Sequence, residues 1–165
     1  MSPIIRLVSG LILIAAAISG CGGEEQASQG DGWRILKSEV PEDPLPITGG
    51  NLLVAMDRQA YEGLWVEGQM VGRLPEVDFS SEIVVRADRF SNDDCDEVIF
   101  ESLDKVPGEN AVELTFKPPS GSACRSFGVS HVVFIAVEKE SLPKAPLEFR
   151  LGEGHGALAA EVASL

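Results

Sequence analysis

Along most of the chain, apolar and polar residues alternate in short runs that are separated by proline, glycine and acidic residues. Runs of this length and period predict β-strands, because successive side chains of a strand point to opposite faces. The run at 129–137 is apolar at almost every position, so we expect it to be the most buried strand. Pro107–Asn110 predicts a turn that joins two strands in a hairpin. The predicted strands are 33–40, 51–56, 81–88, 97–103, 111–116, 129–137 and 147–151.

One segment departs from this pattern and predicts a helix. Tyr61, Leu64 and Trp65 are spaced three and four residues apart, which places them on one helical face. Asp57 precedes the segment and is expected to cap its first turn. We therefore predict a mainly β domain, a small antiparallel sandwich or open barrel, with one short helix packed on the sheet. Trp65 is expected in the core, whereas Trp33 either caps the sheet or lies exposed as an interface residue.

The longest apolar run lies near the N-terminus and ends at a cysteine. Residues 7–18 follow Arg6, the only charged residue before Glu24. They are too few to span a bilayer, which needs about 20 apolar residues, but their number suits the core of a signal peptide. The next residues, Ile18-Ser19-Gly20-Cys21, resemble the bacterial lipobox. In that motif the cysteine receives a diacylglyceryl group and becomes the new N-terminus.

The lipobox resemblance implies a membrane-bound protein. Lipidated Cys21 would anchor it to the cell membrane or outer membrane, facing the extracytoplasmic side. Each buried methylene of an acyl chain contributes about 0.8 kcal/mol, so two or three chains give stable attachment. An ordinary signal peptide or a single-span anchor is the alternative interpretation. We divide the chain into a signal peptide at 1–20, a flexible tether at 21–32, a single β-rich domain at 33–153 and a loose tail at 154–165.

The net charge of the chain limits the classes of partner that it can bind. The formal net charge is −13 at pH 7, and phosphate neutralisation needs a basic face, so we expect no nucleic-acid partner. An anionic bilayer would also repel such a domain. Lipid anchoring is therefore favoured over electrostatic adsorption to a membrane.

The two remaining cysteines predict a disulfide. Cys95 and Cys124 form an even pair in a chain that is expected to be exported. Closing a loop of about 30 residues is worth roughly 3 to 4 kcal/mol in the chain-entropy model. A redox pair or a metal site is the alternative, but the sequence lacks both a CxxC spacing and a nearby histidine cluster.

No group of residues predicts catalysis, a metal or a cofactor. His131 lies within an apolar strand, His155 lies in a glycine-rich segment, and no G-x-S-x-G motif is present. A serine nucleophile needs a base and an orienting acid, so we expect that the protein is not an enzyme. The carboxylates of the acidic turn 93–97 are of the kind that bind calcium, but the turn lacks the EF-hand spacing. We interpret it as a solvated turn.

Several short motifs resemble one known family. The aromatic helix segment Tyr61–Trp65, the segment Leu74–Ser80 and the strand Ile83–Val85 are similar to the PrcB C-terminal domain family. The loop Pro118–Gly121 and the strand Ser130–Phe134 resemble the family's closing loop and strand, so the similarity covers about 52–138. The family is named for a subunit of a surface protease complex. The resemblance implies an accessory or partner-binding lipoprotein, and it brings no catalytic residues.

These observations lead to two hypotheses about function. The first is a lipid-anchored cell-envelope protein whose β domain binds another envelope protein through edge strands and acidic loops. The alternative is a small-molecule or calcium-binding lipoprotein that uses the acidic turn 93–97.

Overall fold

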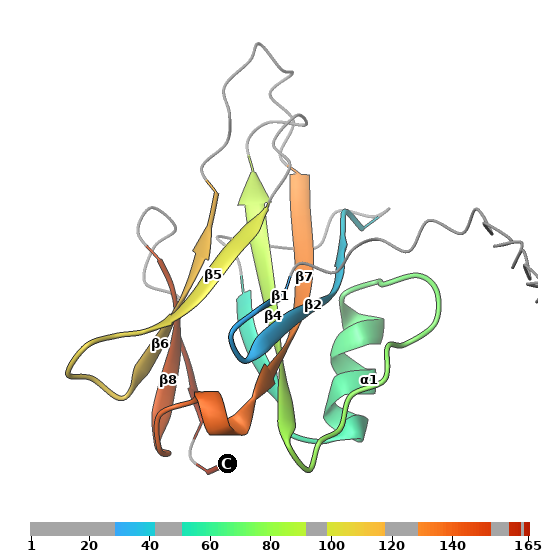
Figure 1. The fold of residues 1–165 in the computed structure, drawn as a ribbon. Helices are drawn as coiled ribbons and strands as arrows, with labels where there is room; N and C mark the ends of the chain where they lie inside the picture. Colours follow the sequence, from blue (N-terminus) through green and yellow to red (C-terminus); the bar gives the residue numbers. More distant parts are fainter. Residues whose placement is uncertain (1–28, 42–50, 92–98, 118–128, 153–158, 163) are drawn as a thin grey trace, which may run out of the picture.

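The computed structural model describes residues 29–41, 51–91, 99–117, 129–152, 159–162 and 164–165. Within these residues, the strands form two sheets that pack face to face, and a helix covers the outer face of the larger sheet (Figure 1). The protein is therefore mainly β with one α-helix, and its sheets form a small sandwich rather than a closed barrel. This confirms the predicted fold class.

The larger sheet has the strand order β1-β2-β7-β4-β3, and all its neighbouring strands are antiparallel. Its strands are β1 Gln29–Gly30, β2 Trp33–Glu39, β3 Asn51–Ala55, β4 Glu82–Ser91 and β7 Val129–Glu138. The smaller sheet has the order β5-β6-β8-β9. Its strands are β5 Phe100–Lys105, β6 Ala111–Phe116, β8 Leu147–Leu151 and β9 Ala159–Val162. The α-helix is α1 Arg58–Glu67, and a 3-10 helix spans Lys139–Ser141.

The smaller sheet is mixed, so the sandwich is antiparallel at every described strand pair except one. β5 and β6 form the predicted antiparallel hairpin, but β6 and β8 run parallel. The chain leaves the smaller sheet after β6, forms β7 in the larger sheet, and then returns as β8. Because no tight turn joins β6 to β8, the connection does not force these neighbours to be antiparallel.

Both ends of the domain extend further than predicted. Gln29 and Gly30, assigned to the tether, form β1, which turns into β2 through Asp31 and Gly32. Gly32 has a φ of +79° and a Cβ there would lie 2.5 Å from the Cβ of Ser141, so the turn requires glycine. The tail was expected to be loose, but β9 pairs antiparallel with β8. β9 was not predicted because it is four residues long and begins with two alanines, which are weak strand formers.

The main core lies between the two sheets. Val85 of β4 and Ile135 of β7 point into it and are fully buried, as is Phe149 of β8. As predicted, β7 is buried along most of its length. Burial of apolar area is the dominant favourable term in folding, so these inward positions set how the two sheets meet.

A second core lies between the larger sheet and α1. The rings of Tyr61 and Trp65 pack against Phe134 of β7, with ring centroids 5.8 and 5.4 Å apart. Trp65 is buried, which confirms its expected core position. Asp57 caps the helix as predicted, because its Oδ1 accepts a hydrogen bond of 2.8 Å from the Ala60 amide. β7 thus has an apolar layer on both faces.

Tyr61 carries a buried hydroxyl within this second core. Its side chain is 1 % exposed, and the hydroxyl makes no hydrogen bond with any described residue. Burial raises the pKa of Tyr61 well above its ordinary value, and the positive charge of Arg34 offsets only part of this effect. The neutral phenol is therefore the form that the folded protein holds.

The raised pKa predicts a loss of stability in alkali. A group whose pKa is higher in the folded state stabilises the protein below its unfolded pKa, here about 10, and this stabilisation is lost as the pH rises further. We expect Tyr61→Phe to leave the free energy of unfolding at pH 7 unchanged or up to about 1 kcal/mol higher, since it removes an unpartnered hydroxyl. We also expect it to reduce the loss of stability above about pH 10. Urea unfolding followed by tryptophan fluorescence measures both effects.

Tyr61 is the only tyrosine of the chain, so any tyrosinate absorbance comes from this residue. In the wild-type protein, tyrosinate should appear only together with unfolding. Ionisation near pH 10 in the folded protein would contradict the buried, neutral phenol.

Candidate functional site

Most residues that the sequence singled out lie outside the described residues. These are Cys21, the pair Cys95 and Cys124, the acidic turn 93–97 and His155. The lipid anchor, the disulfide and the calcium alternative accordingly stay predictions. Within the part that the structure describes, no group of three or more histidine, cysteine, aspartate or glutamate side chains is placed to hold a metal ion. No described helix is long and apolar enough to cross a membrane.

Two of the singled-out residues lie in the sheets. His131 is half-buried in β7, opposite Arg89 of β4. Trp33 of β2 packs edge-on against Phe100 of β5, with ring centroids 4.7 Å apart. This contact joins the two sheets at one side of the sandwich. Trp33 therefore caps the sheets, which is the first of its two predicted roles.

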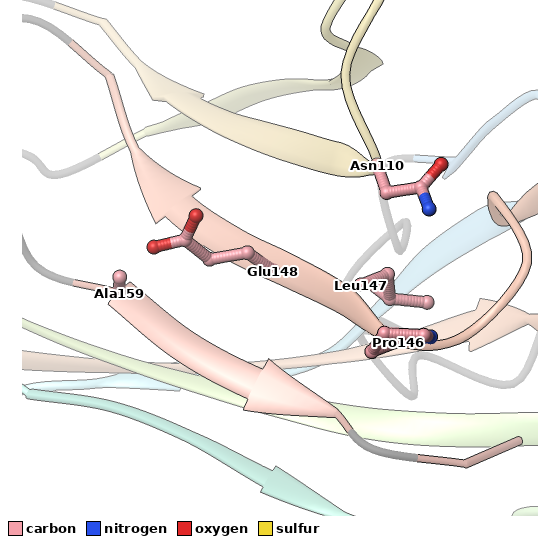
Figure 2. A pocket seen from close by; sticks show the side chains of 5 residues that line it. All are labelled: Asn110, Pro146, Leu147, Glu148 and Ala159. Carbon is pink, nitrogen blue, oxygen red and sulfur yellow. The ribbon is translucent and has the colours of Figure 1, made fainter.

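A shallow hollow of ≈ 450 Å³ lies at one end of the smaller sheet, lined by Asn110, Pro146, Leu147, Glu148 and Ala159. Figure 2 shows the Asn110 amide beside Pro146 and Leu147, and the Glu148 carboxylate at the other end, near Ala159. The two polar side chains point away from each other in this view. The Glu148 carboxylate also accepts two hydrogen bonds from Arg150, of 2.9 and 2.7 Å. Binding pockets usually bring polar groups together on a ligand, so this hollow does not favour small-molecule binding.

A buried ion pair lies beneath α1. Arg86 and Asp88 are 2 % and 0 % exposed, and they lie two residues apart on the same face of β4. Arg86 donates from Nε to Oδ1 of Asp88 at 2.7 Å and from Nη2 to Oδ2 at 2.6 Å. Asn51 of β3 adds a bond of 3.3 Å from its Nδ2 to Oδ2 of Asp88. This parallel geometry satisfies both charges, as burial requires.

The same ion pair holds the end of the helix. Nη1 of Arg86 donates to the Leu64 carbonyl at 3.2 Å and lies 3.7 Å from Oε2 of Glu67. A cation at the C-terminal end of a helix interacts favourably with its dipole. Sequence analysis did not single out Arg86 and Asp88, because alternating polar residues in a strand indicate a face open to water. Their spacing of two residues was the available indication, since it places both side chains on one face.

These contacts predict an asymmetry between single and double substitutions. Asp88→Ala leaves the Arg86 charge buried without its main partner, so we expect a loss of about 3 to 5 kcal/mol in the free energy of unfolding. The double variant Arg86→Met/Asp88→Leu removes both charges and should recover most of that loss. Urea unfolding curves of the two variants and the wild type test this. Equal destabilisation by both variants would show that the pair contributes only packing.

The edge of the larger sheet at β2 is the feature best suited to bind a partner. β1 covers only Trp33 and Arg34, and no other described strand pairs with Ile35–Glu39 on the side away from β7. Two neighbouring half-buried side chains of β2 pack on opposite faces of the sheet. Ile35 packs on the main core, and Leu36 packs on the second core. An added strand would therefore extend the sandwich and the helix layer together.

The other sheet edges are less suited than β2 to pair with a partner strand. β5 exposes Glu101, Asp104 and Lys105, and charged side chains on an edge strand discourage pairing. β9 has only four residues, and β3 lies next to β9 of the opposite sheet.

A β-bulge between Ile35 and Lys37 increases the local twist of β2, so an added strand must follow that twist.

Comparison with known proteins gives no match for this chain among family models, curated proteins or solved structures. The lipobox and the PrcB-like segment thus rest on the motifs themselves. Within the described residues, the fold is a β-sandwich domain with a helix on one outer face and an edge at β2 that only β1 pairs with, at Trp33 and Arg34.

Proposed function

We propose that the chain is a lipid-anchored cell-envelope protein whose β domain binds another envelope protein as an accessory subunit. The partner contributes an extended segment, which adds as a strand beside residues 35–39 of β2. The observation that carries this proposal is the edge of β2 at residues 35–39, which no described strand pairs with on the side away from β7 and where Ile35 and Leu36 belong to the two apolar layers. In strand addition, main-chain hydrogen bonds supply affinity and the alternating side-chain positions supply specificity.

The short segment between the predicted anchor and β1 limits how far the partner can lie from the membrane. Cys21 precedes Gln29, the first described residue, by eight positions. Eight extended residues reach at most about 28 Å. Gln29, where β1 begins, then lies within about 28 Å of the predicted anchor, so the β1–β2 end of the domain and its partner segment are membrane-proximal. The chain's net charge of −13 favours a segment without excess negative charge.

A binding role is favoured over a catalytic one by the arrangement of polar side chains. The ion pairs and hydrogen bonds of the described residues link side chains to one another or to helix and loop ends, as Arg86 and Arg34 do. The hollow lined by Asn110 and Glu148, the one lined by Arg73 and Glu76 and the one lined by Arg34, Glu82 and Glu138 contain no serine, threonine or cysteine nucleophile beside a base. Calcium binding at the acidic turn 93–97 is the outcome to pursue when no partner is found.

Site-specific cross-linking in cells tests the proposal. A photoreactive amino acid replaces Ser38, which is exposed on β2, and a matched control replaces Glu101, which is exposed on the edge strand β5. We expect one dominant envelope protein to be linked from position 38, at least about tenfold more than from position 101. Cys21→Ala, which removes the predicted anchor, should reduce the yield because the partner is membrane-proximal.

Two results would contradict the proposal. One is equal labelling from positions 38 and 101, which would mean that β2 is not the contact. The other is the absence of a linked envelope protein from position 38 in the anchored chain.

A further inference from the structure

Two residues near the end of β2 carry opposite charges on the same face of the sheet. Lys37 and Glu39 lie opposite residues of β7 that belong to the second core, so both side chains are on the helix side. Nζ of Lys37 lies 2.6 Å from Oε1 of Glu39. Ser38 lies between them, on the other face, and is exposed. No described strand pairs with these three residues on the side away from β7.

This order of charges is complementary to itself when the strand is reversed. In an antiparallel pair of two identical strands around a twofold axis at Ser38, Lys37 of each strand lies opposite Glu39 of the other. Opposite charges at directly opposed positions stabilise a strand pair, whereas like charges destabilise it. An axis at Lys37 would oppose two lysines, and an axis between Lys37 and Ser38 would oppose no charges. The charges therefore favour the axis at Ser38.

We infer that a second copy of this chain pairs with residues 36–40 around that axis. The axis is perpendicular to the sheet, so the larger sheet continues from one copy into the other and α1 lies on the same face in both. β1 pairs with Trp33 and Arg34 and leaves this stretch clear. Pro41, which has no amide donor, ends it. The pairing does not depend on the proposed function.

Exposed apolar side chains at the same end of β2 favour this association. Val40 and Val71 are 52 % and 60 % exposed. Val40 lies within the proposed paired stretch, and the Val71 amide donates a hydrogen bond of 3.3 Å to Oε2 of Glu39. A second copy would remove part of both valine side chains from water, and burial of apolar area drives protein association.

The net charge of −13 on each copy opposes the association. At physiological ionic strength, exposed charges that lie more than about 8 Å apart are largely screened. The four charges beside the axis are in contact, so they set the register. Pairing of the two copies also protects β2 from the non-specific pairing to which an uncovered edge strand is prone.

Cross-linking between two copies tests the pairing. Ser38→Cys places a thiol at the axis, where the two Cβ atoms would lie about 5 Å apart. The matched control, Glu101→Cys, places a thiol on the exposed edge strand β5. The full-length chain is expressed in bacteria with two different epitope tags, and the cells are treated with a short bismaleimide. We expect a product with both tags from position 38 and only background from position 101.

Charge exchange in the Ser38→Cys chain tests the register. Lys37→Glu places two acidic side chains beside the axis, and Glu39→Lys places two basic ones there. Each variant alone should therefore link at least about tenfold less than the parent. Co-expressed with different tags, the two variants again oppose unlike charges, and the mixed product should recover to near the parent yield. The ion pair within each chain is lost in both variants, so only a contact between copies explains the recovery.

A matched control separates this contact from general attraction between an acidic and a less acidic chain. Glu101→Lys changes the net charge as much as Glu39→Lys does, but on β5. Co-expressed with Lys37→Glu, it should leave the mixed product low.

The outcomes separate this inference from the proposed function. Equal self-linking from positions 38 and 101 would overturn the second copy as occupant of the edge, and a mixed pair without recovery would overturn the register and the charge contact. Neither result bears on the proposed partner, which is a different chain. A product from position 38 that contains only this chain supports the pairing of two copies and leaves the proposed function to its own test.

Discussion

The structure depends on one constraint, which is that β4 and β7 are buried on both faces. Their alternate side chains point to the smaller sheet and to α1, as Val85 and Val84 do on β4. A sheet covered on both faces meets other molecules mainly at its edges. At β2 both apolar layers reach an edge that β1 only partly covers. The proposed strand addition therefore follows from the way the two cores are stacked.

The Arg86–Asp88 pair is the polar exception within this arrangement. Two charges buried under a helix do not by themselves favour stability, because desolvation offsets their attraction. Their geometry instead specifies where the end of α1 lies, because the Leu64 carbonyl accepts a hydrogen bond from the same guanidinium that binds Asp88. The ion pair thus fixes the end of α1 against β4.

The sequence predicted those parts of the fold that local periodicity encodes. The strand at 129–137 and the helix face of Tyr61 and Trp65 were found because burial imposes a period of two or of 3.6 residues. β1 and β9 were missed because they have only two and four residues and begin with weak strand formers, whereas the parallel pairing of β6 with β8 was missed because it joins segments that are distant in the sequence. The position of β2 near the edge of the larger sheet is likewise a property of the order of the described strands, which no single stretch of sequence contains.

We propose that this domain works beside a membrane, held there by a lipid on Cys21. Intact-mass spectrometry of the chain purified from bacterial membranes tests it most directly. We expect a chain that begins at Cys21 and carries the mass of a diacylglyceryl group, with residues 1–20 removed. A chain that keeps residues 1–20, or one cleaved elsewhere with an unmodified cysteine, would contradict the anchor and the membrane-proximal partner together.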